Sequence, residues 1–208
     1  RGNNSNRRNN VSLKNDSKFD SLTTLTIWAG AGNNNSESFS NSSSKTVDQF
    51  GNRINENDRD FYGDSKSNSY NASGLLTRKF LKEGRSLSFY YGMNGSDNSG
   101  NQLINSKLNY YENNILVRDS LIDQRKVNDD NSLSQSASLS YSEPFSKKFV
   151  ATVEYKFNNS HNSNRVESYN KDAITGEYTK FDELFSNDFD YNTFKNTYSL
   201  SFNYKPID

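Results

Sequence analysis

The sequence predicts an all-β fold, an antiparallel meander of about six to seven long strands that forms part of a large transmembrane β-barrel. Apolar and polar residues alternate with a period of two along most apolar stretches, whereas helical periodicity is almost absent. The connections between the six apolar bands alternate between long and short. Asn and Ser, 33 of each, make up about a third of the 208 residues, yet 13% of the residues are aromatic, which argues against a disordered chain.

The first half of the chain contains three apolar bands and one weaker candidate strand. Residues 11–18 are the weaker candidate and would be the seventh strand. Residues 22–29 and 75–81 are fuller apolar bands with weaker alternation. Residues 87–93 alternate strictly, with Leu, Phe, Tyr and Met at odd positions and Ser, Tyr and Gly between them. This pattern predicts a strand with one apolar and one polar face.

The second half contains three more bands, at residues 133–141, 149–157 and 198–204. Ser occupies every even position of the first, and Ser and Asn alternate with Tyr, Leu and Phe in the last. In the middle band, Glu154 and Lys156 fall on the polar face. If the apolar face meets lipid, we expect these two residues to face the lumen of the barrel.

The connections between these bands are 45, 5, 39, 7 and 40 residues long. A soluble β-sandwich shows turns every 8–12 residues, whereas a transmembrane barrel joins its strands by short periplasmic turns and long extracellular excursions. We therefore expect hairpins at about residues 20–81, 85–143 and 147–204. The Asn- and Ser-rich stretches would be strand extensions in water, with tips near residues 51–60, 112–123 and 171–182.

The two short turns read TRKFLKEGRSLS (residues 77–88) and SYSEPFSKK (residues 140–148). Both resemble periplasmic turns of the outer-membrane β-barrel family of Bacteroides-type bacteria, the barrel part of TonB-dependent-receptor-like proteins, over roughly residues 20–204. Glycine supplies positive φ in a tight turn, and proline ends a strand because it has no N–H to donate. The residues that form these expected periplasmic turns are Lys82, Glu83, Gly84, Arg85, Glu143 and Pro144.

The resemblance implies a transporter in the bacterial outer membrane that takes up a solute. Its implied partners are outer-membrane lipid, the remainder of the parent barrel, an inner-membrane TonB-type energy coupler and a surface lipoprotein. Plugged transporters of this kind have about 22 strands, and no plug domain is recognisable in residues 1–208. We therefore expect this chain to be a single segment of the barrel domain, with residues 204–208 beginning another turn.

Two other functions stay open. One is a surface-adhesive or structural outer-membrane β-protein that does not transport, and the other is a soluble extracellular β-domain. Aromatic side chains flank the apolar bands, as in the interface girdles of barrels, although a soluble sheet would use them as cross-strand pairs. The candidate interface aromatics are Trp28, Tyr91, Tyr141, Tyr155 and Tyr204.

Composition argues against several other classes of protein. Twenty-five basic residues balance 25 acidic ones, so we expect no nucleic-acid partner. There is no Cys and a single histidine, His161, so we expect no metal site. No nucleophile elbow, phosphate-binding loop, zinc-protease or dinucleotide motif occurs. We therefore expect no catalytic residues, no cofactor and no enzymatic activity.

Overall fold

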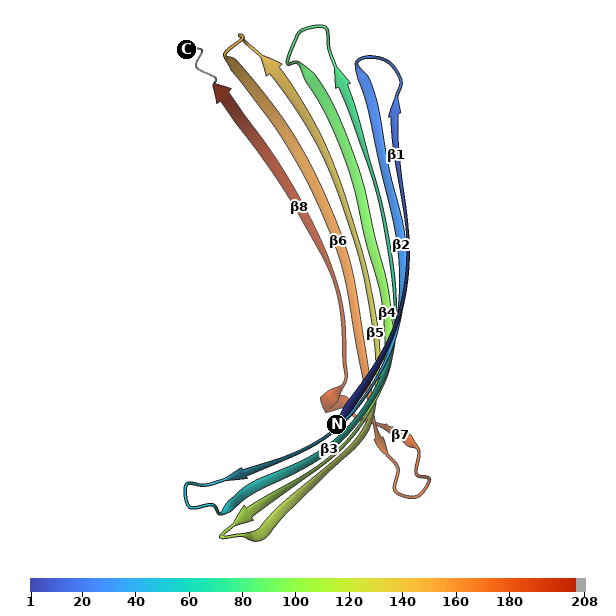
Figure 1. Ribbon diagram of the computed structural model, residues 1–208, viewed down its shortest axis with the longest axis vertical. Coiled ribbons are helices and arrows are strands. Elements are labelled where there is room, and N and C mark those ends of the chain that lie inside the picture. Colours follow the sequence, from blue (N-terminus) through green and yellow to red (C-terminus); the bar gives the residue numbers. More distant parts are fainter. Residues whose placement is uncertain (205–208) are drawn as a thin grey trace.

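The computed structural model describes residues 1–204 as one antiparallel β-sheet that bows along its strands (Figure 1). The predicted all-β meander is confirmed, and the sheet is not closed into a barrel within these residues. Seven strands are long and one is short, with a single 3₁₀ turn. The elements are β1 (Gly2–Lys18), β2 (Thr23–Val47), β3 (Arg53–Lys79), β4 (Ser86–Glu112), β5 (Ile115–Pro144), β6 (Phe149–Lys171), β7 (Tyr178–Phe181), η1 (Glu183–Phe185) and β8 (Asn187–Tyr204).

The strands follow one another through the sheet in chain order as far as β6. Both β7 and β8 then pair with β6, β7 at its far end and β8 along the rest of its length. Residues 205–208, for which we expected the start of another turn, lie outside the described residues. In residues 1–204, no helix is long and apolar enough to cross a membrane.

The strands are far longer than the apolar bands that predicted them. β3 and β4 have 27 residues each and β5 has 30, whereas about 9–11 residues suffice for a tilted membrane strand. The predicted long connections are thus strand extensions that turn at residues 48–52, at residues 113–114 and between residues 172 and 177. The first tip lies upstream of the predicted 51–60, and β1 begins nine residues before the predicted residue 11.

Polar side chains stabilise these extensions by bonding across the strands. Hydroxyl pairs join β2 to β3 through Ser36 and Ser65 at 2.7 Å, and β4 to β5 through Ser96 and Ser132 at 2.9 Å. The next pair in the series joins β5 to β6 through Ser134 at 3.0 Å. Because such pairs stabilise a sheet as apolar pairs do, Asn- and Ser-rich sequence can continue a strand that no apolar alternation marks.

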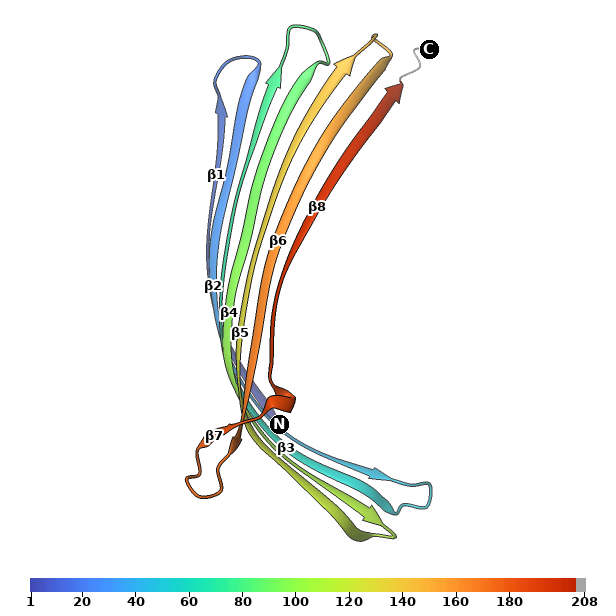
Figure 2. The same ribbon diagram turned by 180° about the vertical axis from the view of Figure 1, so that it is seen from behind.

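The two ends of the sheet differ. All short turns, at residues 19–22, 80–85 and 145–148, lie at one end, the top of Figure 1. At the other end the β2–β3 and β4–β5 hairpins swing together to one side and the β6–β7 hairpin swings to the other, as both views show (Figures 1 and 2). A single sheet has no second layer to bury an apolar core, and Ala151 and Pro144 are the only buried apolar side chains among residues 1–204.

Candidate functional site

The main feature of the sheet is an apolar face. It consists of rows of residues that lie opposite one another in adjacent strands. Residues directly opposite one another in adjacent strands point to the same face. One such row crosses six strands and consists of Leu25, Leu76, Phe89, Leu139, Tyr155 and Tyr198. Phe89 and Leu139 remain 45% and 47% exposed although neighbours surround them in the sheet. We call this surface the apolar face.

The adjacent row, one residue along each strand, is polar throughout. It points to the opposite face, because successive side chains of a strand alternate. Its members, from β2 to β8, are Thr24, Thr77, Ser88, Ser140, Glu154 and Ser199. We call this surface the polar face. In each of these six strands, one residue of the adjacent pair presents an apolar or aromatic side chain to the apolar face. The other presents a hydroxyl or carboxylate group to the polar face.

Glu154 and Lys156 lie on the polar face, two residues apart on β6. The Lys156 ammonium is 3.1 Å from the Glu154 carboxylate. Together with Tyr90, Ser138 and other residues, they line an open hollow of about 300 Å³. Because the two charges are opposite, this part of the polar face carries charged groups but no net charge.

Four of the five candidate interface aromatics, Tyr91, Tyr141, Tyr155 and Tyr204, lie on the apolar face. Three of their hydroxyl groups find acceptors at the edges of the band. Tyr91 donates to Gln135 at 3.1 Å, Tyr155 to Asn196 at 2.7 Å and Tyr141 to Glu143 at 2.6 Å. Each ring thus combines an apolar body with a satisfied polar tip.

Trp28, the fifth candidate interface aromatic, lies on the polar face. Its partners in the sheet are Lys14 and Ser73, and the Lys14 ammonium lies 5.9 Å from the centre of the indole ring. Ile27, the residue before it, takes the position on the apolar face. The band at residues 22–29 is apolar at consecutive positions, so its alternation could not reveal which residue points to which face.

Glu143 joins the two short turns that the sequence singled out. Its carboxylate lies 2.6 Å from the Lys82 ammonium and 2.7 Å from Nε of Arg85. The Arg85 guanidinium, then Lys82 and Tyr141, hold the pKa of Glu143 well below its usual range. Glu83, which lies between Lys82 and Arg85 in the β3–β4 turn, is exposed. Lys82 and Arg85 therefore connect the β3–β4 turn to the end of β5 through Glu143.

Gly84 and Pro144 meet where these turns touch. The φ angle of Gly84 is +84°, a conformation that glycine adopts without strain. A Cβ at this position would lie 3.5 Å from the Pro144 side chain. Pro144 is buried and is the last residue of β5. The turn sequence therefore fits both the backbone and its neighbour.

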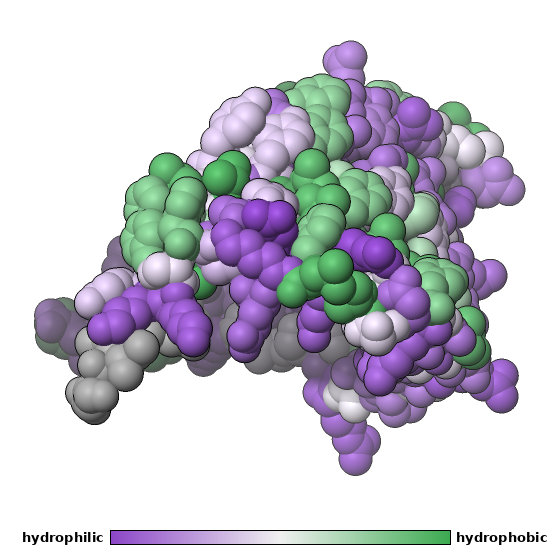
Figure 3. Space-filling view, turned by 90° about the horizontal axis from the view of Figure 1, so that it is seen from above, coloured by the Kyte–Doolittle hydropathy of each residue, from purple (hydrophilic) through white to green (hydrophobic). Residues whose placement is uncertain are grey.

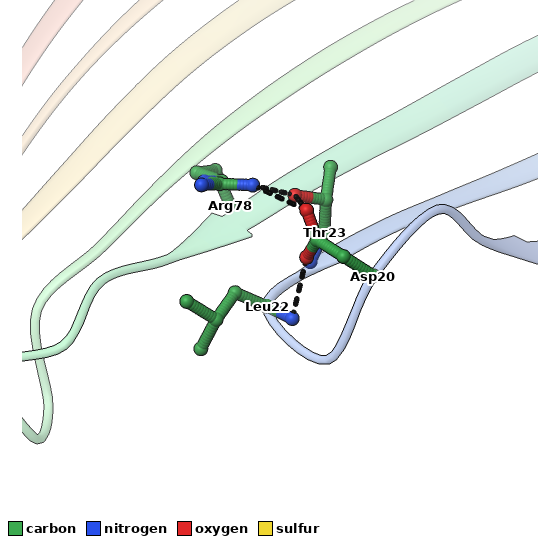
Figure 4. A network of polar contacts seen from close by, with 4 residues as sticks. All are labelled: Asp20, Leu22, Thr23 and Arg78. Atoms are coloured by element: carbon green, nitrogen blue, oxygen red, sulfur yellow. Dashed lines mark hydrogen bonds and ion pairs between the residues drawn. The ribbon is translucent and has the colours of Figure 1, made fainter.

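A second cluster at the same end, built on Asp20, was not predicted (Figure 4). One carboxylate oxygen accepts from the N–H groups of Leu22 and Thr23, each at 2.7 Å, and the other lies 2.7 Å from the Arg78 guanidinium. These bonds, that of Leu22 first, lower the pKa of Asp20. The signal was present, since an Asp side chain often accepts from the backbone N–H two residues on and so favours this turn.

The short-turn end therefore carries charges that are paired between adjacent strands. Viewed from this end, apolar side chains lie directly beside the polar and charged side chains (Figure 3). The Arg78 guanidinium pairs with the Asp20 carboxylate in the β1–β2 turn. The Arg85 guanidinium pairs with the Glu143 carboxylate near the end of β5. The charged turns and the apolar band are thus separated by only one or two residues along each strand.

At the far end, the segment after β6 folds back onto the polar face, which the sequence did not reveal. The Gln124 amide donates to Asn170 at 2.9 Å and to Asp182 at 3.0 Å. Ser168, which is fully buried, donates its hydroxyl to the Phe185 carbonyl oxygen at 2.6 Å. Gln124 and Ser168 are both on the polar face. The 3₁₀ turn η1 therefore covers part of that face beside β6.

Two ionisable groups stabilise this segment. Asp172 accepts from the N–H groups of Thr175 and Ile174, and these bonds together with Lys180 lower its pKa to about 2. Burial, with a 2.6 Å bond to Asp123, raises the pKa of Tyr178 to about 12. Both groups lie in the far-end loop, away from the apolar band.

His161 and the acidic residues do not assemble into a metal centre in the part of the chain that the structure describes. The His161 ring nitrogen Nδ1 lies 3.0 Å from Asn192 and 3.4 Å from Asp190, on β8. Comparison with protein-family models and with curated proteins found no match to the chain. The arguments about function therefore depend on the two faces and the turns.

Proposed function

We propose that this chain forms part of the wall of a β-barrel in the bacterial outer membrane. Its apolar face would lie against lipid hydrocarbon and its polar face would line an aqueous lumen. The observation that carries the proposal is the pair of adjacent rows, one entirely apolar and one entirely polar across six strands. Alternation of apolar-out and polar-in residues is the signature of such walls.

The height of the apolar band supports this assignment. On β6 it covers residues 149–157, which is about 27 Å along the strand, or about 21 Å of depth at a tilt of about 40°. The apolar band of transmembrane barrels is about 25 Å tall. The strand extensions beyond it would stand in water on the extracellular side, and the short turns would lie on the periplasmic side.

The open edges of β1 and β8 would need partner strands in a membrane. In hydrocarbon, each backbone N–H and C=O must have a partner, so a sheet can cross only as part of a closed barrel. Further strands of the same barrel would pair with these edges. The polar face, with Glu154 and Lys156, would then enclose the path of a solute.

The resemblance of the two short turns extends the proposal to transport. A TonB-dependent-receptor-like barrel would take up a solute through this lumen, with energy supplied by an inner-membrane coupler and capture assisted by a surface lipoprotein. The reading frame upstream of Arg1 tests this part. A plug domain there supports transport, whereas a signal peptide directly before the barrel supports an adhesive or structural surface protein.

The membrane assignment is tested on the native protein. An antibody against this chain is used on outer-membrane fractions that are run unboiled and boiled on SDS gels. A band much larger than 23.7 kDa that shifts on boiling is expected for an SDS-resistant barrel. A 23.7 kDa species in the soluble fraction, unchanged by boiling, would contradict the proposal.

A further inference from the structure

The far end contains an open strand edge between two consecutive strands of the sheet. β5 pairs with β4 along its whole length, beginning with Ile115 opposite Glu112. Its pairing with β6 begins only at Gln124. The stretch from Ile115 to Asp123 therefore has a strand on one side and, within residues 1–204, none on the other. Its outward backbone N–H and C=O groups form an unpaired row.

Closing the sheet into a barrel would leave this edge open. Strands added next to β1 or β8 extend the two outer edges, whereas the open stretch lies between β5 and β6. β6 ends at Lys171, and the chain then enters β7, which pairs with the opposite side of β6. The β4–β5 and β6–β7 hairpins diverge in both views (Figures 1 and 2).

The sequence of this edge differs from that of other exposed edges. Residues 115–123 read ILVRDSLID, and Ile115 and Leu121 are 69% and 66% exposed. On the other side of the same extension, Asn41 of β2 bonds to Arg1, and residues 42–47 have a partner strand on the β3 side only within residues 1–204 and read SSSKTV. Proteins protect open edges with polar residues and lysine. The β5 edge carries Arg118, Asp119 and Asp123 among its residues, but its two apolar stretches, residues 115–117 and 121–122, have no polar residue within them.

We propose that residues 115–123 bind an extended segment of another polypeptide, which adds a strand to the sheet at this edge. Only a polypeptide backbone satisfies a row of alternating donors and acceptors. The bound segment would lay an aromatic ring or an aliphatic stem against Leu116 and Leu121 and would carry a cation opposite Asp119. The Arg118 guanidinium already stacks on Tyr110 at 4.7 Å, whereas Asp119 has no ion pair among residues 1–204.

A second copy of this chain fits the edge less well. In a two-fold symmetric antiparallel pair, the residue at the axis lies opposite itself. An axis at Arg118 or Asp119 brings like charges together, which destabilises the pair. An axis at Ser120 places Arg118 opposite Ile122 and Asp119 opposite Leu121, so that neither charge has a partner. A different polypeptide avoids both arrangements.

This surface lies far from the apolar band. Leu121 lies 12 positions before Leu133, where the apolar band of β5 begins, about 40 Å along the strand. The proposal therefore does not depend on the membrane assignment, and either can fail without the other.

The test uses a synthetic peptide of residues 104–112, INSKLNYYE, because this β4 sequence already fits the side chains of the same β5 stretch. Hydrogen exchange of the full chain in detergent is followed by mass spectrometry with and without peptide. We expect fast exchange at residues 115–122 without peptide and at least about tenfold slower exchange at saturation, with residues 42–47 unchanged. Slower exchange at residues 42–47 instead would overturn the proposal, as would no change at any soluble peptide concentration.

Matched variants locate the contact. Val117→Lys introduces a charge at the apolar end of the open edge and is expected to weaken peptide binding by about fivefold. Thr46→Lys makes the same change at the β2 edge and is expected to have no effect. Circular dichroism of both variants establishes that the sheet is intact. Equal affinities for the two variants would place the peptide elsewhere.

A charged peptide tests the cation opposite Asp119. The Asn109→Lys peptide is expected to bind about fivefold tighter at low salt, and the Asp119→Asn variant of the chain should abolish this gain. A gain that persists in Asp119→Asn argues against the proposed register. Slow exchange at residues 115–122 without peptide, together with a dimer by light scattering, would make a second copy the occupant and overturn the proposal.

Discussion

At the scale of single residues, Glu143 joins two turns by its charge, and this predicts an effect of pH. Its pKa is lower in the folded chain than its ordinary value of 4.5, chiefly because of Arg85. A lowered pKa contributes stability above the ordinary value, and this contribution is lost as the pH falls below about 4.5. We expect Glu143→Gln to lower the denaturation midpoint at pH 7 and to flatten its decline between pH 7 and pH 3. Glu83→Gln, an exposed glutamate in the neighbouring β3–β4 turn, should behave as the wild type.

Tyr178 predicts an effect in the alkaline range, with the opposite sign. Its pKa is raised from 10 to about 12, chiefly by burial, so it stabilises the folded chain below pH 10. This contribution disappears as the pH rises towards 12. We expect hydrogen exchange in residues 172–186 to accelerate over this range in the wild type, and Tyr178→Phe to weaken that dependence. The exposed Tyr204→Phe is the control, and an equal change in both variants would contradict the prediction.

At the scale of a strand, β5 offers adjacent residues on opposite faces as a matched pair. Leu139 lies on the apolar face and Ser140 on the polar face, opposite Glu154. We expect Leu139→Arg to lower the free energy of unfolding from lipid vesicles by about 2–4 kcal/mol, because an arginine at mid-depth contacts hydrocarbon. Ser140→Arg should change it little. Urea titrations of the whole parent barrel, followed by tryptophan fluorescence, measure both, and a reversed order would place lipid on the other face.

The β4–β5 hairpin tests how two adjacent tips are held together. Asn113 and Asn114 both have positive φ, as a two-residue hairpin turn requires. The Asn114 side chain also accepts from the Arg53 N–H at 2.8 Å and donates to Asn52 at 3.1 Å. Asn114→Gly keeps the turn but removes both bonds, so we expect faster amide exchange at residues 48–53. Asn113→Gly, which keeps them, should leave exchange there unchanged.

At the scale of the whole molecule, the open apolar face predicts how the purified chain behaves. Contiguous exposed apolar surface associates in water, and both outer edges of the sheet can pair with other strands. We expect a defined species by light scattering in detergent and large aggregates when detergent is removed. A monodisperse monomer without detergent would favour the soluble β-domain.

The sequence predicted the order of the strands and the position of two of the three short turns, because strict alternation marks strands and Gly84 and Pro144 mark where they stop. It predicted the positions of the far tips less well. Asn and Ser extend the strands through side-chain hydrogen bonds, and these residues show no apolar alternation. The sequence did not reveal which face Trp28 points to, because Ile27 beside it is also apolar. The folded-back segment at η1 was missed because its bonds, such as Gln124 to Asp182, join residues distant in the chain.

The meander also sets the order in which the chain can fold. From β1 to β6, each strand pairs with the one before it, so these strands can add to the sheet in chain order. The two-residue link at Asn113 and Asn114 closes with little loss of chain entropy. The long strands nevertheless pair residues that are far apart in the chain, such as Thr23 and Arg78, which favours slow folding. Because residues 172–186 lie between β6 and β8, we expect β8 to dock on β6 only after that segment orders.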